Sequence, residues 1–338
     1  MNRFEYVRPG SVGEAIRALA GMPDARALAG GTNLVDLMKY DVATPSRVVD
    51  INRLPLKDFT ETSSGGLRIG ALVTNSEVAW DPRVVKRYPL LSSAILAGAS
   101  PQLRNAATTG GNLLQRTRCY YFYDPSTSCN KRMPGSGCAA IGGINRIHAI
   151  LGMSDDCIAV HPSDMCVALA ALDAIVHVEG PNGARVVPFA EFHRLPANEP
   201  QRDTTMQPGE LIIAVELPAS DFGSNHTYLK IRDRLSYAFA LVSVAAALRI
   251  ENGVIAEARL ALGGVAHKPW RDRAAEEMLR NQKPDESQFG RCADEILREA
   301  KGQGSNDFKV ELARRTIVRA LRQAAAGTPQ VQSDKAIN

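Results

Sequence analysis

Charge of one sign and long apolar runs are both scarce in this sequence. Of its 338 residues, 40 are Lys or Arg and 36 are Asp or Glu, which gives a net charge of +4. Nucleic-acid binding usually requires a strongly basic face, so this balance argues against it. The longest nearly apolar run, residues 237–248, is well short of the roughly 20 residues of a membrane-spanning helix. We therefore expect neither nucleic-acid binding nor membrane insertion.

An export signal and an internal repeat are also missing. Residues 1–21 show neither the apolar core nor the small-residue cleavage site of a secretory signal. No repeat appears at a period of about 20–50 residues. The composition, 45% hydrophobic and 22% charged, is that of a globular protein. The chain is longer than one hydrophobic core usually serves, so two or three domains are expected.

Hydrophobic periodicity predicts an α+β fold. Up to about residue 220 the expected strands, mixed with helices, lie at residues 3–8, 26–29, 47–51, 66–72, 148–153, 157–160, 175–178 and 184–187. Near residues 218–225 the composition shifts to Ser, Asp, Gly and Asn, which indicates a domain boundary. Beyond it, strands are expected at 228–232, 238–250 and 254–262, and helices at 271–280, 289–301 and 308–325.

Two glycine pairs occur in similar local sequences. Ala29-Gly30-Gly31-Thr32-Asn33 follows a predicted strand, and Thr108-Thr109-Gly110-Gly111-Asn112 repeats the pattern. Glycines let a ligand approach the backbone, and free N–H groups at a helix start favour an anion such as a diphosphate. Neither segment matches GxGxxG or GxxxxGK[ST], so a nicotinamide Rossmann fold and a P-loop are not indicated. The segments would bracket a dinucleotide if they converge, but ordinary strand–turn–helix corners are the alternative.

Four of the six cysteines fall in or beside a poorly periodic loop that begins near residue 115. They are Cys119, Cys129, Cys138 and Cys157. Long irregular loops are usually functional, and four thiolates suit either tetrahedral zinc or a [4Fe–4S] cluster. The alternative is that these cysteines bind no metal and are small buried apolar residues, although a polar loop is a poor place for such side chains. Cys166 is an alternative fourth ligand, but Cys157 begins a predicted strand, from which a side chain projects more easily than from a helix. We interpret Cys166 and Cys292 as structural.

The glycine segments also carry a family resemblance. Residues 26–34 read RALAGGTNL, residues 108–114 read TTGGNLL and residues 161–164 read HPSD. These sequences resemble the FAD-binding segments of the flavoprotein subunits of molybdenum hydroxylases, the family of xanthine dehydrogenase, carbon monoxide dehydrogenase and aldehyde oxidoreductases. The similarity continues through residues 209–218 and 227–248, and so covers most of the chain. It is strongest to the FAD subunits of bacterial heterotrimeric aldehyde oxidoreductases, which carry an additional [4Fe–4S] cluster.

The resemblance implies an α+β architecture of two domains. The first, residues 1–220, would be an FAD-binding domain like that of vanillyl-alcohol oxidase (PCMH type), with subdomains over about 1–55 and 56–220. A [4Fe–4S] insertion would occupy about 115–157. Residues 221–330 would form a smaller α+β domain of the carbon monoxide dehydrogenase flavoprotein type, and residues 331–338 a flexible tail.

The resemblance also assigns residues to cofactors. For FAD they are Arg26, Ala27, Leu28, Ala29, Gly30, Gly31, Thr32, Asn33, Leu34, Thr108, Thr109, Gly111, Asn112, Asp164, Ile212 and Lys230. The first nine would wrap the diphosphate and adenosine, the threonine–glycine segment would make a second diphosphate contact, and the last two would lie near the adenine and the flavin. For the [4Fe–4S] cluster they are Cys119, Cys129, Cys138 and Cys157.

Several of these residues also have ordinary structural interpretations. Ser163 or Asp164 can cap the helix that follows them. A strand lysine such as Lys230 often keeps its tip in solvent. His161, beside the cap, is expected to be structural, and Phe239 belongs either beside the flavin or in a strand core.

The function implied by the resemblance is electron transfer within a heterotrimer. A large molybdenum-cofactor subunit would oxidise an aldehyde, and a small [2Fe–2S] subunit would pass electrons to this FAD. An external acceptor such as ferredoxin, quinone or oxygen would receive them. Nothing in the chain resembles a molybdopterin-binding or [2Fe–2S] sequence, so no catalytic residue is assigned. A stand-alone flavin oxidase or dehydrogenase and a zinc-binding scaffold are the alternatives. The resemblance also implies a periplasmic location through co-export with a signal-bearing partner.

Overall fold

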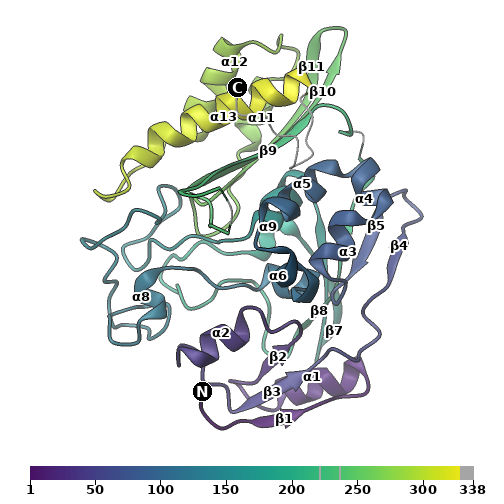
Figure 1. Ribbon diagram of the computed structural model, residues 1–338, viewed down its shortest axis with the longest axis vertical. Coiled ribbons are helices and arrows are strands. Elements are labelled where there is room, and N and C mark those ends of the chain that lie inside the picture. Colours follow the sequence, from purple (N-terminus) through teal and green to yellow (C-terminus); the bar gives the residue numbers. More distant parts are fainter. Residues whose placement is uncertain (221, 236, 328–338) are drawn as a thin grey trace.

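The computed structural model describes residues 1–220, 222–235 and 237–327 (Figure 1). Three β-sheets succeed one another along the long axis, in the order of the sequence from the N-terminal end at the bottom of the view. The expected tail, residues 331–338, lies outside the described residues. No helix within the described ranges is both long and apolar enough to cross a membrane.

The N-terminal sheet is small and parallel, with strand order β1-β3-β2. Ser11 caps the first helix, as predicted, by accepting a hydrogen bond from the Glu14 amide. The Glu14 carboxylate in turn accepts from the Gly10 amide, one residue before the position of an ordinary capping box. The elements are β1 (Glu5–Val7), α1 (Val12–Ala20), β2 (Arg26–Leu28), α2 (Leu34–Lys39) and β3 (Arg47–Asp50).

A five-stranded sheet of order β4-β5-β8-β6-β7 forms the middle of the molecule, and all of its neighbouring strands are antiparallel. Its strands are β4 (Phe59–Glu61), β5 (Leu67–Gly70), β6 (Ile175–Gly180), β7 (Gly183–Pro188) and β8 (Leu211–Leu217). The helices of this part are α3 (Asn75–Trp80), α4 (Pro82–Arg87), α5 (Pro89–Ala97), α6 (Pro101–Ala106), α7 (Thr109–Leu113), α9 (Asp164–Ala171) and α10 (Phe189–Phe192). Every residue of α9 is buried, which explains why that segment is apolar on all sides.

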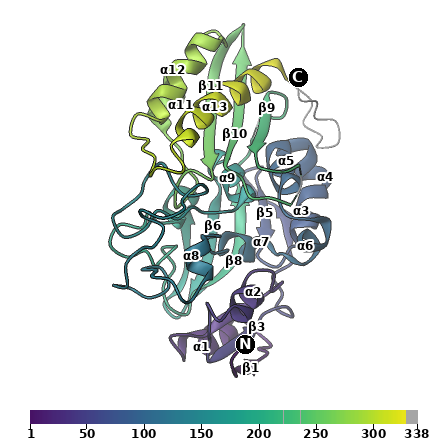
Figure 2. The same ribbon diagram turned by 60° about the vertical axis from the view of Figure 1, so that its left-hand side comes forward.

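The C-terminal sheet is antiparallel, with order β11-β10-β9. Its strands are β9 (His226–Ile231), β10 (Val242–Glu251) and β11 (Val254–Gly263), and its helices are α11 (Arg273–Met278), α12 (Glu286–Ile296) and α13 (Phe308–Ala326). The helices cover one face (Figure 2), and α5 and α9 pack against the other. Alternate residues of β10 therefore enter two different cores, and the strand reads as a continuous apolar run.

Two strands expected from the sequence, at residues 148–153 and 157–160, do not form. Ile150 and Leu151 instead pack as loop residues into the C-terminal core, and their amides donate to the Val265 carbonyl. The strand expected from residue 238 begins only at Val242. The insertion between α7 and α9 is irregular except for α8 (Tyr120–Tyr123).

Leu321 tests how α13 stabilises this architecture. Its side chain is fully buried against the C-terminal sheet. We expect Leu321→Ala to lower the free energy of unfolding by about 2–5 kcal/mol, through lost burial and the cavity left behind. Urea denaturation followed by circular dichroism measures this. Arg315→Ala, on the exposed side of the same helix, should change the value by less than about 0.5 kcal/mol, and an equal loss in both variants would contradict the packing described.

Candidate functional site

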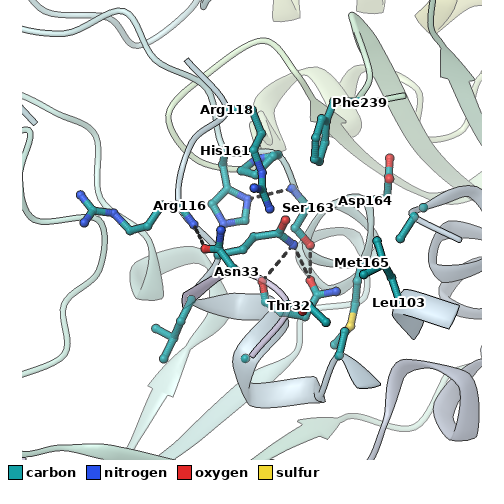
Figure 3. A pocket seen from close by; sticks show the side chains of 18 of the residues that line it. Thr32, Asn33, Leu103, Arg116, Arg118, His161, Ser163, Asp164, Met165 and Phe239 are labelled. Carbon is teal, nitrogen blue, oxygen red and sulfur yellow. Dashed lines mark hydrogen bonds between the residues drawn. The ribbon is translucent and has the colours of Figure 1, made fainter. Parts of the chain in front are cut away.

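A cavity of about 830 Å³ lies where the N-terminal, middle and C-terminal parts of the chain meet. Its wall combines the 26–37 segment, residues 103–120 and 160–165 of the middle part, and residues 233–241 of the C-terminal part, as far as these are described. Figure 3 shows side chains from all of these regions pointing into it. The volume is in the usual range for small-molecule and cofactor sites.

The two glycine segments converge on this cavity. A Cβ on Gly30 would lie only 1.8 Å from the Ala106 carbonyl oxygen, so the two backbones touch there. Gly31 has a φ of +73°, which a side chain would disfavour. The second glycine pair differs from the prediction in one respect. Gly110 and Gly111 lie inside the short helix α7, and Thr108 caps that helix by accepting from the Gly111 amide.

Unused hydrogen-bond donors line the first segment. The backbone N–H groups of residues 30–33 have no acceptor within the described part of the chain. The Asn33 Nδ2 is buried without a partner, while its Oδ1 accepts from the Arg116 amide at 2.8 Å. Across the cavity, the Asn75 side chain holds Asn112 at 2.8 Å. Buried donors without acceptors are costly, so this wall suits a ligand that carries anionic oxygens.

The charge of the cavity wall also favours an anionic ligand. The basic side chains on the wall outnumber the acidic ones: they are Arg26, Arg104, Arg116, Arg118, Arg234 and Lys230, against Asp36, Asp164 and Asp233. Desolvation and then the neighbouring Arg116 charge lower the pKa of Arg26. A diphosphate fits both the free amides and this positive potential.

Asp164 and Lys230 form a buried ion pair at 2.8 Å on the cavity wall. Ser163 caps α9 through the Cys166 amide, which leaves the Asp164 carboxylate free for other partners. The Asp164 carboxylate also accepts a hydrogen bond from the Tyr228 hydroxyl at 2.7 Å. Burial and this carboxylate together raise the pKa of Tyr228 well above its usual value. The Lys230 tip is buried and donates to the Ala97 carbonyl, so the solvent-exposed alternative is wrong.

All predicted FAD residues except Leu28 and Thr109 line the cavity. Thr109 is fully buried, and its hydroxyl donates to the Val73 carbonyl at 2.9 Å. Phe239 is half exposed in a cavity-lining loop, so its strand-core alternative is wrong. The Arg118 guanidinium lies 5.0 Å from the Phe239 ring centroid. Apart from Arg26, the arginines on this wall were not predicted as FAD-site residues, although Arg116 and Arg118 closely follow the second glycine segment.

The four predicted cluster cysteines also converge. Cys119, Cys129, Cys138 and Cys157 line one small pocket, and all four are free thiols. Burial, opposed in part by nearby backbone N–H groups, raises the pKa of Cys119 to about 12. Burial likewise raises the pKa of Cys157 to about 11, although Lys131 acts in the opposite direction. Thiols in such a site ionise readily only when a bound cation compensates the charge.

The spacing of these sulfurs favours a group larger than one ion. Among the described residues, one trio of His, Cys, Asp or Glu ligand atoms lies within 4.8 Å of one another, and it contains none of these four cysteines. A tetrahedral zinc ion with Zn–S bonds near 2.3 Å would hold its sulfurs about 3.8 Å apart. Cys157 belongs to the pocket and Cys166 does not, although Cys157 lies in a loop and does not begin the strand that was expected there.

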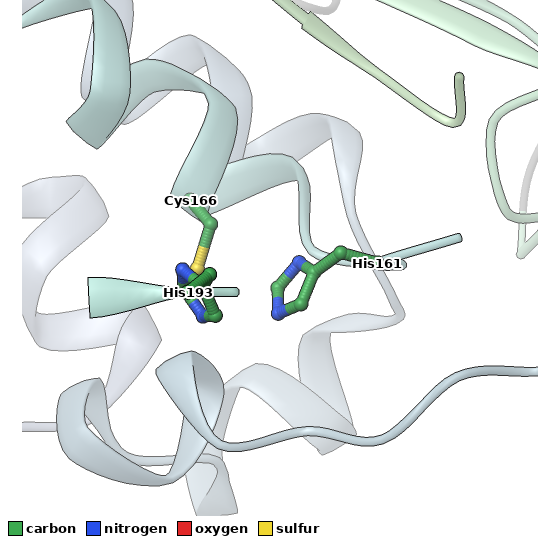
Figure 4. Close-up of side chains that lie close together, drawn as sticks. All are labelled: His161, Cys166 and His193. Atoms are coloured by element: carbon green, nitrogen blue, oxygen red, sulfur yellow. The ribbon is translucent and has the colours of Figure 1, made fainter. Parts of the chain in front are cut away.

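The trio is His161, Cys166 and His193 (Figure 4). All three are buried, and the two imidazole rings lie 4.4 Å apart. His193 donates from Nε2 to the Leu113 carbonyl at 2.8 Å. A closed structural metal site needs four ligands, and the trio supplies three. His161 lines the large cavity, whereas Cys166 and His193 lie outside its lining and are buried in the core.

The fold and this site define a two-domain flavoprotein subunit, and family models agree. Residues 2–220 match "FAD binding domain in molybdopterin dehydrogenase", and residues 226–324 match "CO dehydrogenase flavoprotein C-terminal domain". The chain therefore belongs to the FAD-binding medium subunits of the molybdenum hydroxylase family, whose members are oxidoreductase subunits. The predicted family and fold class are confirmed.

Individual relatives cover nearly the whole chain. An aldehyde oxidoreductase FAD-binding subunit, PaoB of Escherichia coli K12, is 49% identical over 328 residues, 96% of this chain and 99% of that protein. The carbon monoxide dehydrogenase medium chain of Hydrogenophaga pseudoflava is 28% identical over 331 residues, 96% of this chain and 98% of that one. A solved carbon monoxide dehydrogenase from the same organism superposes with a TM-score of 0.76 at 28% identity, covering 96% of this chain and 98% of that chain.

Gly30 provides the sharpest test of the site. Gly30→Ala places a methyl group against the Ala106 carbonyl, so the two glycine segments must separate. We expect FAD affinity to fall by about tenfold or more, equivalent to at least 1.4 kcal/mol. The measurements are FAD bound per purified chain and titration of the FAD-free protein with FAD. Gly13→Ala, where the added Cβ meets only an ordinary 3.5 Å contact, should bind FAD normally. Equal affinity in both variants would refute the convergence argument.

Proposed function

We propose that this chain is the FAD- and [4Fe–4S]-binding electron-transfer subunit of a molybdenum-dependent aldehyde oxidoreductase. One observation carries the proposal. Two converging glycine segments line the large cavity, and four converging thiols line the cysteine pocket. Thr117 and Cys119 form a wall that the two sites share. The aldehyde substrate is taken from the 49% identical relative that carries this activity in its name.

FAD fits the larger cavity. The free amides of residues 30–33 and the Asn33 amide group would bind the diphosphate, and Arg26 would offset its charge. Ile212 would pack against an apolar part of the cofactor, because its buried side chain lies in the wall beside Gly110. When bound, FAD supplies the electron-transfer chemistry, which side chains alone do not provide.

The donor atoms of the cysteine pocket suit a [4Fe–4S] cluster. Four thiols surround it, and the Ala159 amide points at the Cys157 sulfur at 3.5 Å. Lys131 contributes positive charge beside Cys157, which favours a thiolate and a negatively charged cluster. The loop is firmly held, because Arg132 donates to the carbonyls of Tyr121 and Phe122. The sulfur spacing argues against a single zinc ion, and hence against a zinc scaffold.

The partners follow from the family. The relatives are medium subunits of multi-subunit enzymes, and nothing in this chain resembles a molybdopterin-binding or [2Fe–2S] sequence. We propose a heterotrimer in which a large molybdenum-cofactor subunit oxidises the aldehyde and a small [2Fe–2S] subunit delivers electrons to this chain. An external acceptor such as ferredoxin, quinone or oxygen then receives them. A stand-alone flavin oxidase fits less well, because the chain matches such subunits over almost the whole length of both proteins.

Cysteine substitutions test the cluster. In anaerobically purified protein we expect about four iron and four acid-labile sulfide per chain, as a [4Fe–4S] cluster contains. Serine at Cys119, Cys129, Cys138 or Cys157 should remove most of both, because one thiolate ligand is lost. Cys292→Ser is the matched control: this cysteine is buried in the C-terminal core, outside the cysteine pocket, and the iron content of the variant should equal that of the wild type. The assignment would be rejected if only the Cys292→Ser variant lost iron, or if the purified protein contained zinc in place of iron.

The cellular location can be tested separately. We propose that the folded chain reaches the periplasm by co-export with a partner that carries a twin-arginine signal. Deleting that signal should move this chain from the periplasmic to the cytoplasmic fraction, measured by immunoblotting beside a resident protein of each compartment. An unchanged periplasmic fraction would contradict co-export.

A further inference from the structure

Cys119 and His148 occupy the wall between the two cavities. Cys119 and Thr117 line both the large cavity and the cysteine pocket, and His148 lines the large one. The His148 imidazole Nε2 lies 3.0 Å from the Cys119 sulfur, and both side chains are buried. The histidine is therefore in contact with one sulfur of the proposed cluster site and faces the proposed FAD site.

The position of His148 is fixed by the C-terminal domain. Lys309, at the start of α13, donates to the His148 carbonyl at 2.7 Å, and Asn306 donates to the same oxygen at 3.2 Å. The His148 ring lies beside the rings of Tyr120 and Tyr121, with centroid separations of 6.4 and 6.3 Å. A backbone clamped in this way holds the imidazole against the sulfur with little freedom to turn.

The chemistry of a metal-bound thiolate defines the role of that imidazole. Such a sulfur only accepts hydrogen bonds, so the facing Nε2 must carry the proton. Hydrogen bonds to cluster sulfurs stabilise the more negative, reduced state and so raise the reduction potential. The Cys157 sulfur faces the backbone N–H of Ala159, and backbone N–H groups of Tyr121 and Phe122 also act on the Cys119 sulfur. The His148 contact at Cys119 comes from a side chain, which a substitution can remove.

We propose that His148 is a positioning residue that donates a hydrogen bond from Nε2 to the Cys119 sulfur and thereby raises the reduction potential of the [4Fe–4S] cluster. The inference rests on the proposed function, since it requires the cluster. It gives a specific role to the wall between the two sites: His148, in that wall, would raise the reduction potential of the cluster.

Potentiometric titration of the anaerobically purified complex, followed by the EPR signal of the reduced cluster, tests the proposal. We expect His148→Leu to make the midpoint potential more negative at unchanged iron and sulfide content. His148→Gln should return the midpoint potential most of the way to the wild-type value, because the glutamine amide places an N–H group at a similar distance from the sulfur. His177→Gln is the control: His177 pairs with Glu216 on the middle sheet, away from both cavities, and the potential should not change.

A measurement on the wild type keeps the test independent of how the variants fold. With ¹⁵N-labelled histidine, pulsed EPR of the reduced cluster should show one weakly coupled nitrogen. No coupling, or an unchanged potential in His148→Leu, would overturn the inference while leaving the cluster in place. Strong coupling would also overturn it, because His148 would then be an iron ligand. A wild-type protein without iron and sulfide would refute the proposed function together with the inference.

Discussion

The close contact between the Gly30 backbone and the Ala106 carbonyl is the constraint on which the cofactor site depends. No side chain fits between them. This contact brings the turn after strand β2 against the C-terminal end of α6, just before the second glycine segment, and the cavity lies beside the junction. Because the donors of residues 30–33 are not used internally, the site is preformed for an anionic ligand and does not need to rearrange to bind one.

A second constraint holds the cysteine loop in place. Asp203 pairs with both Lys131 and Arg116, and His267 lies 3.6 Å away. Burial opposes ionisation of Asp203, but these three neighbours together lower its pKa well below the usual value. One carboxylate thus connects the cysteine loop, the edge of the large cavity and the C-terminal domain. This network gives an otherwise irregular insertion a fixed position relative to the cavity.

Local patterns in the sequence predicted much of this molecule. The cap at Ser11, the hairpin of β10 and β11 and the strand before Gly30 depend on neighbouring residues, and all appear in the structure. The convergence of the glycine segments and the Asp164–Lys230 pair, whose partners are 66 residues apart, depends on tertiary packing that spacing does not encode. Ile150 misled the strand prediction because its burial comes from a neighbouring domain and not from a sheet.

The central claim is that FAD and an iron–sulfur cluster lie side by side with Cys119 between them. A crystal structure of the anaerobically purified protein, with anomalous data at the iron edge, tests this most directly. The account predicts flavin density along residues 29–33 and 108–112, and an iron cluster bounded by the four cysteine sulfurs, with Cys119 on the side nearest the flavin. A single metal ion in that pocket, or flavin density away from the glycine segments, would contradict it.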